Sequence, residues 1–280
     1  MNHKKYYFLA GLPRSGNTLL ASILNQNDQI NVSANSLVSS ILYSIVSNNY
    51  VGIEESLIFK NFPDKKSLVN CISGCFDSYY KDWTGKIIID RSNWGTPYNL
   101  KILEDFCPNE LKFICPIRPT LDILCSFIKL YEKNKLINVR NKAEVRAACE
   151  QLMAEEGVLY RGINSVLNLS KSKYSESTLF VSYENLCSDT ELEIERIYKF
   201  IGLNKYNHNY TNITQYKING ISYNDNINAY YKDLHKLRTK VSKRDYELRK
   251  ILPGDVIDRY LDLSFKQLTN QASAHLPMNP

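Results

Sequence analysis

The chain has 280 residues, of which 44% are hydrophobic and 23% are charged, and its formal net charge is +6. A chain of this length buries one large core and leaves room for a covering helical part. The positive excess favours anionic ligands, but the basic residues are too scattered for a nucleic-acid-binding protein. No apolar run approaches the roughly 20 residues of a membrane span. The first apolar run, which leads into Gly11, is too short for a secretory signal.

The seven cysteines are odd in number and scattered, and several of them lie within apolar runs. This pattern favours packed, reduced thiols and a cytoplasmic location over a disulfide framework. Cys71 and Cys75 have helical spacing, but no histidine or second cysteine pair follows nearby. We therefore expect no metal site.

Apolar runs and helical periodicity alternate along the chain. Strands are predicted at 6–10, 86–90, 111–117 and 178–183. Helices are predicted from residue 18, at 37–46, 66–80 and 98–106, after Pro119, and at 143–169 and 191–201. This alternation predicts an α/β fold with a mostly parallel sheet and helices on both faces.

The whole chain, 1–280, is expected to form a single domain. Its core covers about 5–203. A less regular helical part follows at about 204–266, with short helices predicted at 243–251 and 255–263. The remainder, 267–280, is expected to be a frayed tail.

The segment GLPRSGNT, residues 11–18, lies between a predicted strand and a predicted helix. In such a loop the backbone N–H groups converge on a phosphate, and the glycines at 11 and 16 allow the close approach. Asn17 stands where a P-loop carries the lysine that reaches the terminal phosphates of a nucleoside triphosphate. The cation is instead Arg14, inside the loop, so the pattern is a poor fit to an ATPase.

The run LPRSGNTLL, residues 12–20, resembles the first signature of the sulfotransferases that use 3′-phosphoadenosine 5′-phosphosulfate (PAPS), and is most similar to the tyrosylprotein branch. The resemblance implies a P-loop-containing nucleotide-binding fold, PAPS as the donor and adenosine 3′,5′-bisphosphate (PAP) as the product. It also implies that the 5′-phosphosulfate is held by the loop residues Arg14, Ser15, Gly16, Asn17 and Thr18.

Two later segments resemble the family's motifs in the same order. Arg118 ends a predicted strand and Ser126 follows eight positions later, a pair that the resemblance assigns to the donor's 3′-phosphate. A guanidinium fork binds phosphate bidentately, and a hydroxyl two helical turns away can face the same anion. Tyr183 ends the predicted strand 178–183, and the resemblance places it beside the adenine; packing in the core is the alternative. Arg238 and Lys240 either complete the 3′-phosphate pocket or belong to a solvated basic face.

Sulfuryl transfer requires an in-line acceptor and cations that stabilise charge on the leaving group. Arg14 is the first candidate for this role and Arg91 is the second. The family's general base, a histidine or a glutamate, is missing, and Asn35 falls where the tyrosylprotein branch has its glutamate. Asp90 is the nearest carboxylate and a candidate base, although an ion pair with a neighbouring cation is the structural alternative. His235 is a more distant candidate.

We therefore predict transfer of a sulfuryl group from PAPS to a hydroxyl or amine by in-line displacement. The alternatives are a degenerate PAPS- or PAP-binding protein without turnover and a P-loop small-molecule kinase, which would need Mg²⁺. The acceptor, whether a small molecule, sugar, lipid or peptide, is not specified by the sequence, and neither is the oligomeric state. Aromatic residues line an acceptor pocket or pack in the core: Trp94, Tyr98, Tyr216, Tyr223, Tyr230 and Tyr231.

Overall fold

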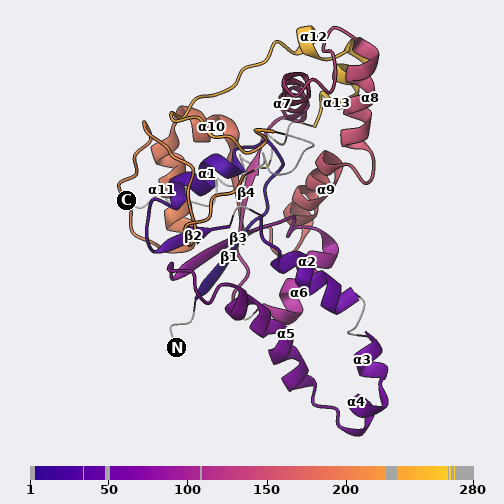
Figure 1. The fold of residues 1–280 in the computed structure, drawn as a ribbon, viewed down its shortest axis with the longest axis vertical. Helices are drawn as coiled ribbons and strands as arrows, with labels where there is room; N and C mark the ends of the chain where they lie inside the picture. The colour runs from indigo at the N-terminus through magenta and orange to yellow at the C-terminus, as the bar shows by residue number, and fades with distance from the viewer. Residues whose placement is uncertain are drawn as a thin grey trace.

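The computed structural model describes residues 4–33, 35–47, 51–107, 109–224, 232–263, 265 and 268. Within these residues, all strands of the central sheet are parallel, and their order is β2-β3-β1-β4-β5. The strands are β1 (Lys5–Leu9), β2 (Ile30–Val32), β3 (Ile87–Arg91), β4 (Phe113–Ile117) and β5 (Thr178–Ser182). Helices cover both faces (Figure 1), so the predicted α/β fold with a parallel sheet is confirmed.

Alternate side chains of β1 explain why both faces are apolar. Tyr7 and Leu9 point to one face and Tyr6 and Phe8 to the other, because successive side chains of a strand lie on opposite sides. The first face is covered by α1 (Asn17–Leu24) and α11 (Thr190–Ile201). The second face is covered by α2 (Val38–Ile45), α5 (Lys65–Tyr79) and α6 (Pro97–Phe106). A parallel sheet buried on both sides needs the continuous apolar runs seen in this sequence.

A third apolar cluster lies at the carboxyl end of the sheet, where β4 contributes Cys115 and Ile117 and β5 contributes Phe180. The helices of this cluster are α7 (Thr120–Lys133), α8 (Lys142–Met153), α9 (Val158–Lys171), α12 (Leu248–Ile251) and α13 (Gly254–Tyr260). The C-terminal helices therefore pack against the same body as the sheet. This cluster supports one wall of the cavity described below.

The prediction of one long helix over 143–169 is wrong, because α8 ends at Met153 and α9 begins at Val158. At Gly157 the backbone passes so close to α8 that an added Cβ would lie 2.3 Å from the carbonyl oxygen of Leu152. Only glycine permits this approach. The resulting turn brings residues 151–161 to the rim of the cavity.

Other elements differ from the expectations more modestly. The short elements β2, α3 (Val51–Glu55), α4 (Leu57–Asn61) and α10 (Tyr183–Ser188) were not predicted. Helices α12 and α13 are shorter than expected. Tyr230, Tyr231 and all but one residue of the predicted tail, 267–280, lie outside the described residues. In the described part of the chain, no helix is both long and apolar enough to cross a membrane.

Candidate active site

The glycine loop joins β1 to α1 through two left-handed backbone conformations. Gly16 has a φ of 92° and serves as the N-cap of α1, and Arg14 has a φ of 60°. A non-glycine residue in this region is strained, and such strain is concentrated at ligand-binding sites. The N-terminus of α1 and its backbone N–H groups favour an anion at this position.

The side chains of Ser15 and Asn17 hold the loop in shape. The Ser15 hydroxyl lies 2.5 Å from the carbonyl oxygen of Leu12 and 2.9 Å from that of Pro116, and the Asn17 amide donates to the Leu12 carbonyl at 2.6 Å. Both side chains are buried. Ser15 does not line the cavity, whereas Asn17 does. The Ser15 hydroxyl therefore fixes the loop, and binding of the donor by Ser15 stays a prediction.

The Arg14 side chain leaves the loop and crosses toward α7 and the C-terminal segment. Its Nε donates to the Ser126 hydroxyl at 3.0 Å, and its guanidinium also donates to the carbonyl of Leu234. Burial and the nearby Arg244 lower the pKa of Arg14 to about 10. Among the described residues, no carboxylate lies within ion-pair distance of Arg14. Within the part of the chain that the structure describes, this buried cation therefore has hydrogen-bond acceptors but no counter-ion.

Arg118 lies at the end of β4, with 3% of its surface exposed. Its guanidinium stacks on the ring of Tyr183 at 4.1 Å and donates to the carbonyls of Arg14 (3.3 Å) and Arg244 (3.0 Å). The Nε atom of Arg118 is buried without a hydrogen-bond partner, although the carboxylate of Asp122 is 3.9 Å away. This buried guanidinium therefore keeps donor capacity that an anionic group can use.

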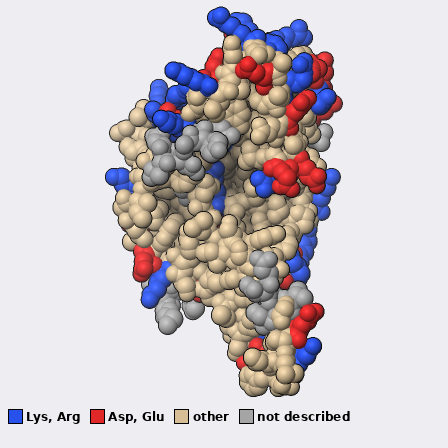
Figure 2. Space-filling model, turned by 45° about the vertical axis from the view of Figure 1, so that its right-hand side comes forward, with Lys and Arg blue, Asp and Glu red and all other residues tan. Residues whose placement is uncertain are grey.

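These groups line one cavity of about 820 Å³. Its walls are the glycine loop, the ends of β3 and β4, the turn between α8 and α9, and residues 234–244. Figure 2 shows the surface hollowed near its middle, with basic side-chain atoms inside the hollow. The cavity brings together most of the predicted site residues: Arg14, Gly16, Asn17, Thr18, Arg91, Arg118, Ser126, Tyr183, Arg238 and Lys240.

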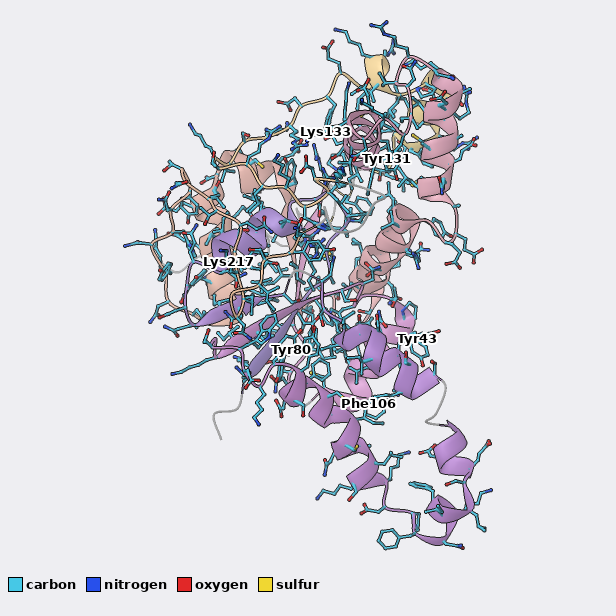
Figure 3. All side chains as sticks on the ribbon, in the orientation of Figure 1. Tyr43, Tyr80, Phe106, Tyr131, Lys133 and Lys217 are labelled. Atoms are coloured by element: carbon cyan, nitrogen blue, oxygen red, sulfur yellow. The ribbon has the colours of Figure 1, made fainter. Side chains whose placement is uncertain are left out.

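Asp90, the candidate base, is not among the lining residues. It is fully buried beside β1, where it accepts hydrogen bonds from the Tyr80 hydroxyl and from the indole nitrogen of Trp94 at 2.9 Å. Tyr80, labelled in Figure 3, reaches Asp90 from the end of α5. Burial raises the pKa of Asp90, and its hydrogen-bond donors oppose this effect. The assignment of Asp90 as general base is therefore corrected to a structural role.

Beside Arg91, the half of the cavity next to β3 is lined by small neutral polar side chains, most of which the sequence did not single out. Ser39 and Ser92 share a hydrogen bond at 2.7 Å, and Ser40 and Asn93 lie nearby. Asn35 also lines this half, and its amide donates to the Tyr223 hydroxyl at 3.3 Å. This wall can form hydrogen bonds with an uncharged partner.

The remaining aromatic candidates have varied positions. Trp94 is fully buried and belongs to the core. Tyr98 is exposed and its ring centre lies 4.8 Å from that of Tyr43 on α2 (Figure 3). Tyr216 is half-buried, and burial raises its pKa while the nearby Arg91 opposes the effect. None of the three lines the cavity among the described residues.

Cysteines and potential metal ligands give no further site. All seven cysteines lie in described parts of the chain and are free. Nowhere in those parts do three or more His, Cys, Asp or Glu side chains gather as metal ligands.

The fold and the phosphate-type loop are those of an α/β nucleotide-binding protein, and a comparison with known protein families assigns the class. A family model described as "Sulfotransferase domain" matches residues 4–247. The chain therefore belongs to the sulfotransferase family, as its resemblance indicated. A sequence comparison with the curated proteins finds no match.

Solved structures of sulfotransferases share this fold. One is the sulfotransferase domain from the curacin biosynthetic pathway, with 16% identity over 99% of this chain and 98% of that chain and a TM-score of 0.52. Another is a sulfotransferase from Alicyclobacillus acidocaldarius, with 12% identity over 97% of this chain and 95% of that chain and a TM-score of 0.51. At these identities the likeness concerns the fold alone.

Proposed function

We propose that this sulfotransferase uses PAPS as its donor and transfers the sulfuryl group to a hydroxyl or amine. The observation that carries the proposal is the convergence of Arg14, Arg118 and Arg244 on one cavity at the end of a phosphate-type loop. PAPS has anionic groups at both its 5′ and its 3′ positions, which matches an extended cationic site. A cavity of about 820 Å³ also has room for a nucleotide and part of an acceptor.

In this proposal the 5′-phosphosulfate lies at the N-terminus of α1, against the backbone N–H groups of Gly16, Asn17 and Thr18. The 3′-phosphate binds Arg118 and Ser126, and the adenine lies beside Tyr183. Arg238 and Lys240 add positive charge at the rim; both are exposed, so they contribute mainly to attraction of the donor.

The transfer step is an in-line displacement at sulfur. The acceptor oxygen or nitrogen forms a bond to sulfur while the bond from sulfur to the 5′-phosphate oxygen breaks. PAP leaves with the electron pair, and the acceptor gives up its proton. Arg14 stabilises the charge that develops on the leaving oxygen. Arg91, which lines the cavity at the end of β3, is the second candidate for this role.

The sheet order supports separate places for donor and acceptor. Arg118 and Tyr183 follow β4 and β5, on one side of β1, so the donor occupies that side. Ser39, Ser92 and Asn35 lie on the other side, near β3 and β2. The acceptor then enters over this neutral polar wall. The predicted cytoplasmic location stays a prediction.

Ligand binding provides the first test. PAP at about 100 times its Kd adds about 2.7 kcal/mol to the free energy of unfolding, which raises Tm by roughly 5–10 °C. ATP with Mg²⁺ should have little effect, because Asn17 replaces the lysine that a kinase uses. An equal shift from both ligands, or none from PAP, would contradict the donor assignment.

Substitution of Arg14 separates catalysis from binding. We expect Arg14→Ala to lower single-turnover sulfuryl transfer from labelled PAPS by roughly 100- to 1000-fold. PAP affinity should fall less, because the N–H groups of the loop remain. Arg14→Lys should recover part of the rate through its point charge. A rate loss that only follows the loss of PAP affinity would move the leaving-group role to Arg91. A wild type that binds PAP but never turns PAPS over would be a binding protein.

A further inference from the structure

Few side chains in the cavity can accept a proton. Among its described lining residues, Glu156 is the one carboxylate, and it lies at the outer rim with a side chain that is 91% exposed and 3.9 Å from Arg161. Asp90 is buried outside the cavity and already bound by Tyr80 and Trp94. The neutral wall of serines and asparagines has no basic group. Of the described lining residues, His235 alone carries an imidazole.

His235 lies close to the groups that handle the donor. It directly follows Leu234, whose carbonyl accepts a hydrogen bond from the Arg14 guanidinium. The cation proposed for the leaving group therefore contacts the backbone of the residue that precedes the imidazole.

His235 also lies close to the acceptor side of the cavity. Its ring centre is 4.7 Å from that of Tyr223, with the planes nearly perpendicular at 78°. The Tyr223 hydroxyl in turn accepts the hydrogen bond from Asn35, a residue of the neutral wall. A chain of contacts thus runs from the acceptor wall through Tyr223 to His235.

We propose that His235 is the general base of the transfer, an inference that rests on the proposed function. The imidazole takes the proton as the acceptor O–H bond breaks and the new O–S bond forms. The bond from sulfur to the 5′-phosphate oxygen breaks, and PAP leaves with its electron pair beside Arg14. The imidazolium then returns its proton to solvent. Histidine is the commonest side chain in this role, because its basicity suits neutral pH.

Several titratable or charged groups lie around His235, and the effect of pH on His235 must be separated from their titration. Tyr223 faces the ring directly, and Lys236 is the next residue in the chain. The other charged groups of the lining are Arg14, Arg91, Arg118, Glu156, Arg161, Arg238, Lys240 and Arg244. Glu156 is the carboxylate among them, so Glu156→Gln is the matched control for His235→Gln.

The test measures single-turnover consumption of labelled PAPS with two acceptor probes of different acidity, ethanol and 4-nitrophenol, and with water alone. His235→Gln should slow transfer to ethanol and water by roughly 100-fold or more, because general-base catalysis contributes this much. Transfer to 4-nitrophenol, which is far more acidic than ethanol and is already partly ionised at neutral pH, should fall much less. The acidic limb of the pH–rate profile should disappear, and added imidazole should restore part of the rate. Glu156→Gln should behave as the wild type does.

PAP affinity is measured for each variant, so that a folding defect is recognised. Equal rates for His235→Gln and the wild type with ethanol and water overturn the base role but leave the proposed function intact. An equal loss with all three acceptors also overturns it, because such a loss does not depend on proton removal. A wild type that neither binds PAP nor consumes PAPS overturns the proposed function itself, and the base role with it.

Discussion

Arg118 offers the sharpest test of how the donor is recognised. In Arg118 two guanidinium nitrogens already donate to backbone carbonyls, and Nε is buried without a hydrogen-bond partner. The fork therefore retains donors for a phosphate. Charge-assisted hydrogen bonds contribute about 1.5–3 kcal/mol each. Loss of a bidentate contact in Arg118→Ala should thus cost about 3 kcal/mol, roughly a hundredfold in PAP affinity.

The comparison of PAP with adenosine 5′-monophosphate isolates this contact. Both nucleotides share the 5′-phosphate and the adenine, and only PAP has the 3′-phosphate. Calorimetric Kd values for both ligands, in the wild type and in Arg118→Ala, give a double difference from which general damage to the pocket cancels. The PAP affinity of Arg118→Lys should lie between those of the wild type and Arg118→Ala, because lysine keeps the charge but loses the fork and the stacking on Tyr183.

A rim cation provides the matched control. Arg238 is exposed and donates to the Ser242 hydroxyl at 2.9 Å, so Arg238→Ala should change PAP affinity by less than about tenfold, as expected of a screened surface charge. If Arg118→Ala weakens PAP and adenosine monophosphate equally, Arg118 supports only the local fold. The 3′-phosphate must then bind elsewhere.

Two further predictions concern the loop and the pH dependence of stability. Gly11→Ala should destabilise the protein by about 1–3 kcal/mol and weaken PAP binding, because the added Cβ would lie 2.5 Å from Pro116. Urea unfolding measures the change in stability. Gly74→Ala is the control variant, because a Cβ added at Gly74 would meet open space. His208 has a pKa lowered to about 4 by burial, whereas the unfolded chain protonates near 6.5. As the pH falls from about 6.5 to about 4, protons bind the unfolded chain but not the folded one, so the free energy of unfolding should decrease by about 1–2 kcal/mol, allowing for solvent screening. His208→Gln should abolish this decrease.

The fold was predictable where the pattern is local. Each of β1, β3, β4 and β5 is a buried apolar run followed by a helical period. Strand β2 was missed because it has three residues with Asn31 in the middle, too few to show a period. Its pairing with β3 depends on chain more than 50 residues away. Gly157 itself indicated the break between α8 and α9. The helical periodicity continues on both sides of it, so the sequence pattern predicted a single helix.

The sequence did contain a signal that Asp90 is buried in the core. Side chains of a strand alternate, so Asp90 shares a face with Ile88, which lies in the core cluster of Tyr80 and Trp94. The period of two therefore places the carboxylate in the core. What the sequence could not supply was the identity of its donors, because Tyr80 belongs to a helix whose packing is set by tertiary structure.

The proposed donor half of the site is formed by one short segment of the sequence, whereas the proposed acceptor half is formed by residues far apart in the chain. In the proposed donor half, backbone N–H groups and a cation converge within one loop, residues 11–18, and this arrangement requires a fixed spacing that is visible in the sequence. The proposed acceptor half instead combines single side chains from α2 and the end of β3 with His235 from the C-terminal segment. None of these segments needs a particular spacing to form its own backbone structure. The phosphate-type loop was therefore predictable from residue order. The position of His235 next to Leu234, whose carbonyl contacts Arg14 more than 200 residues earlier in the chain, follows only from the packed fold.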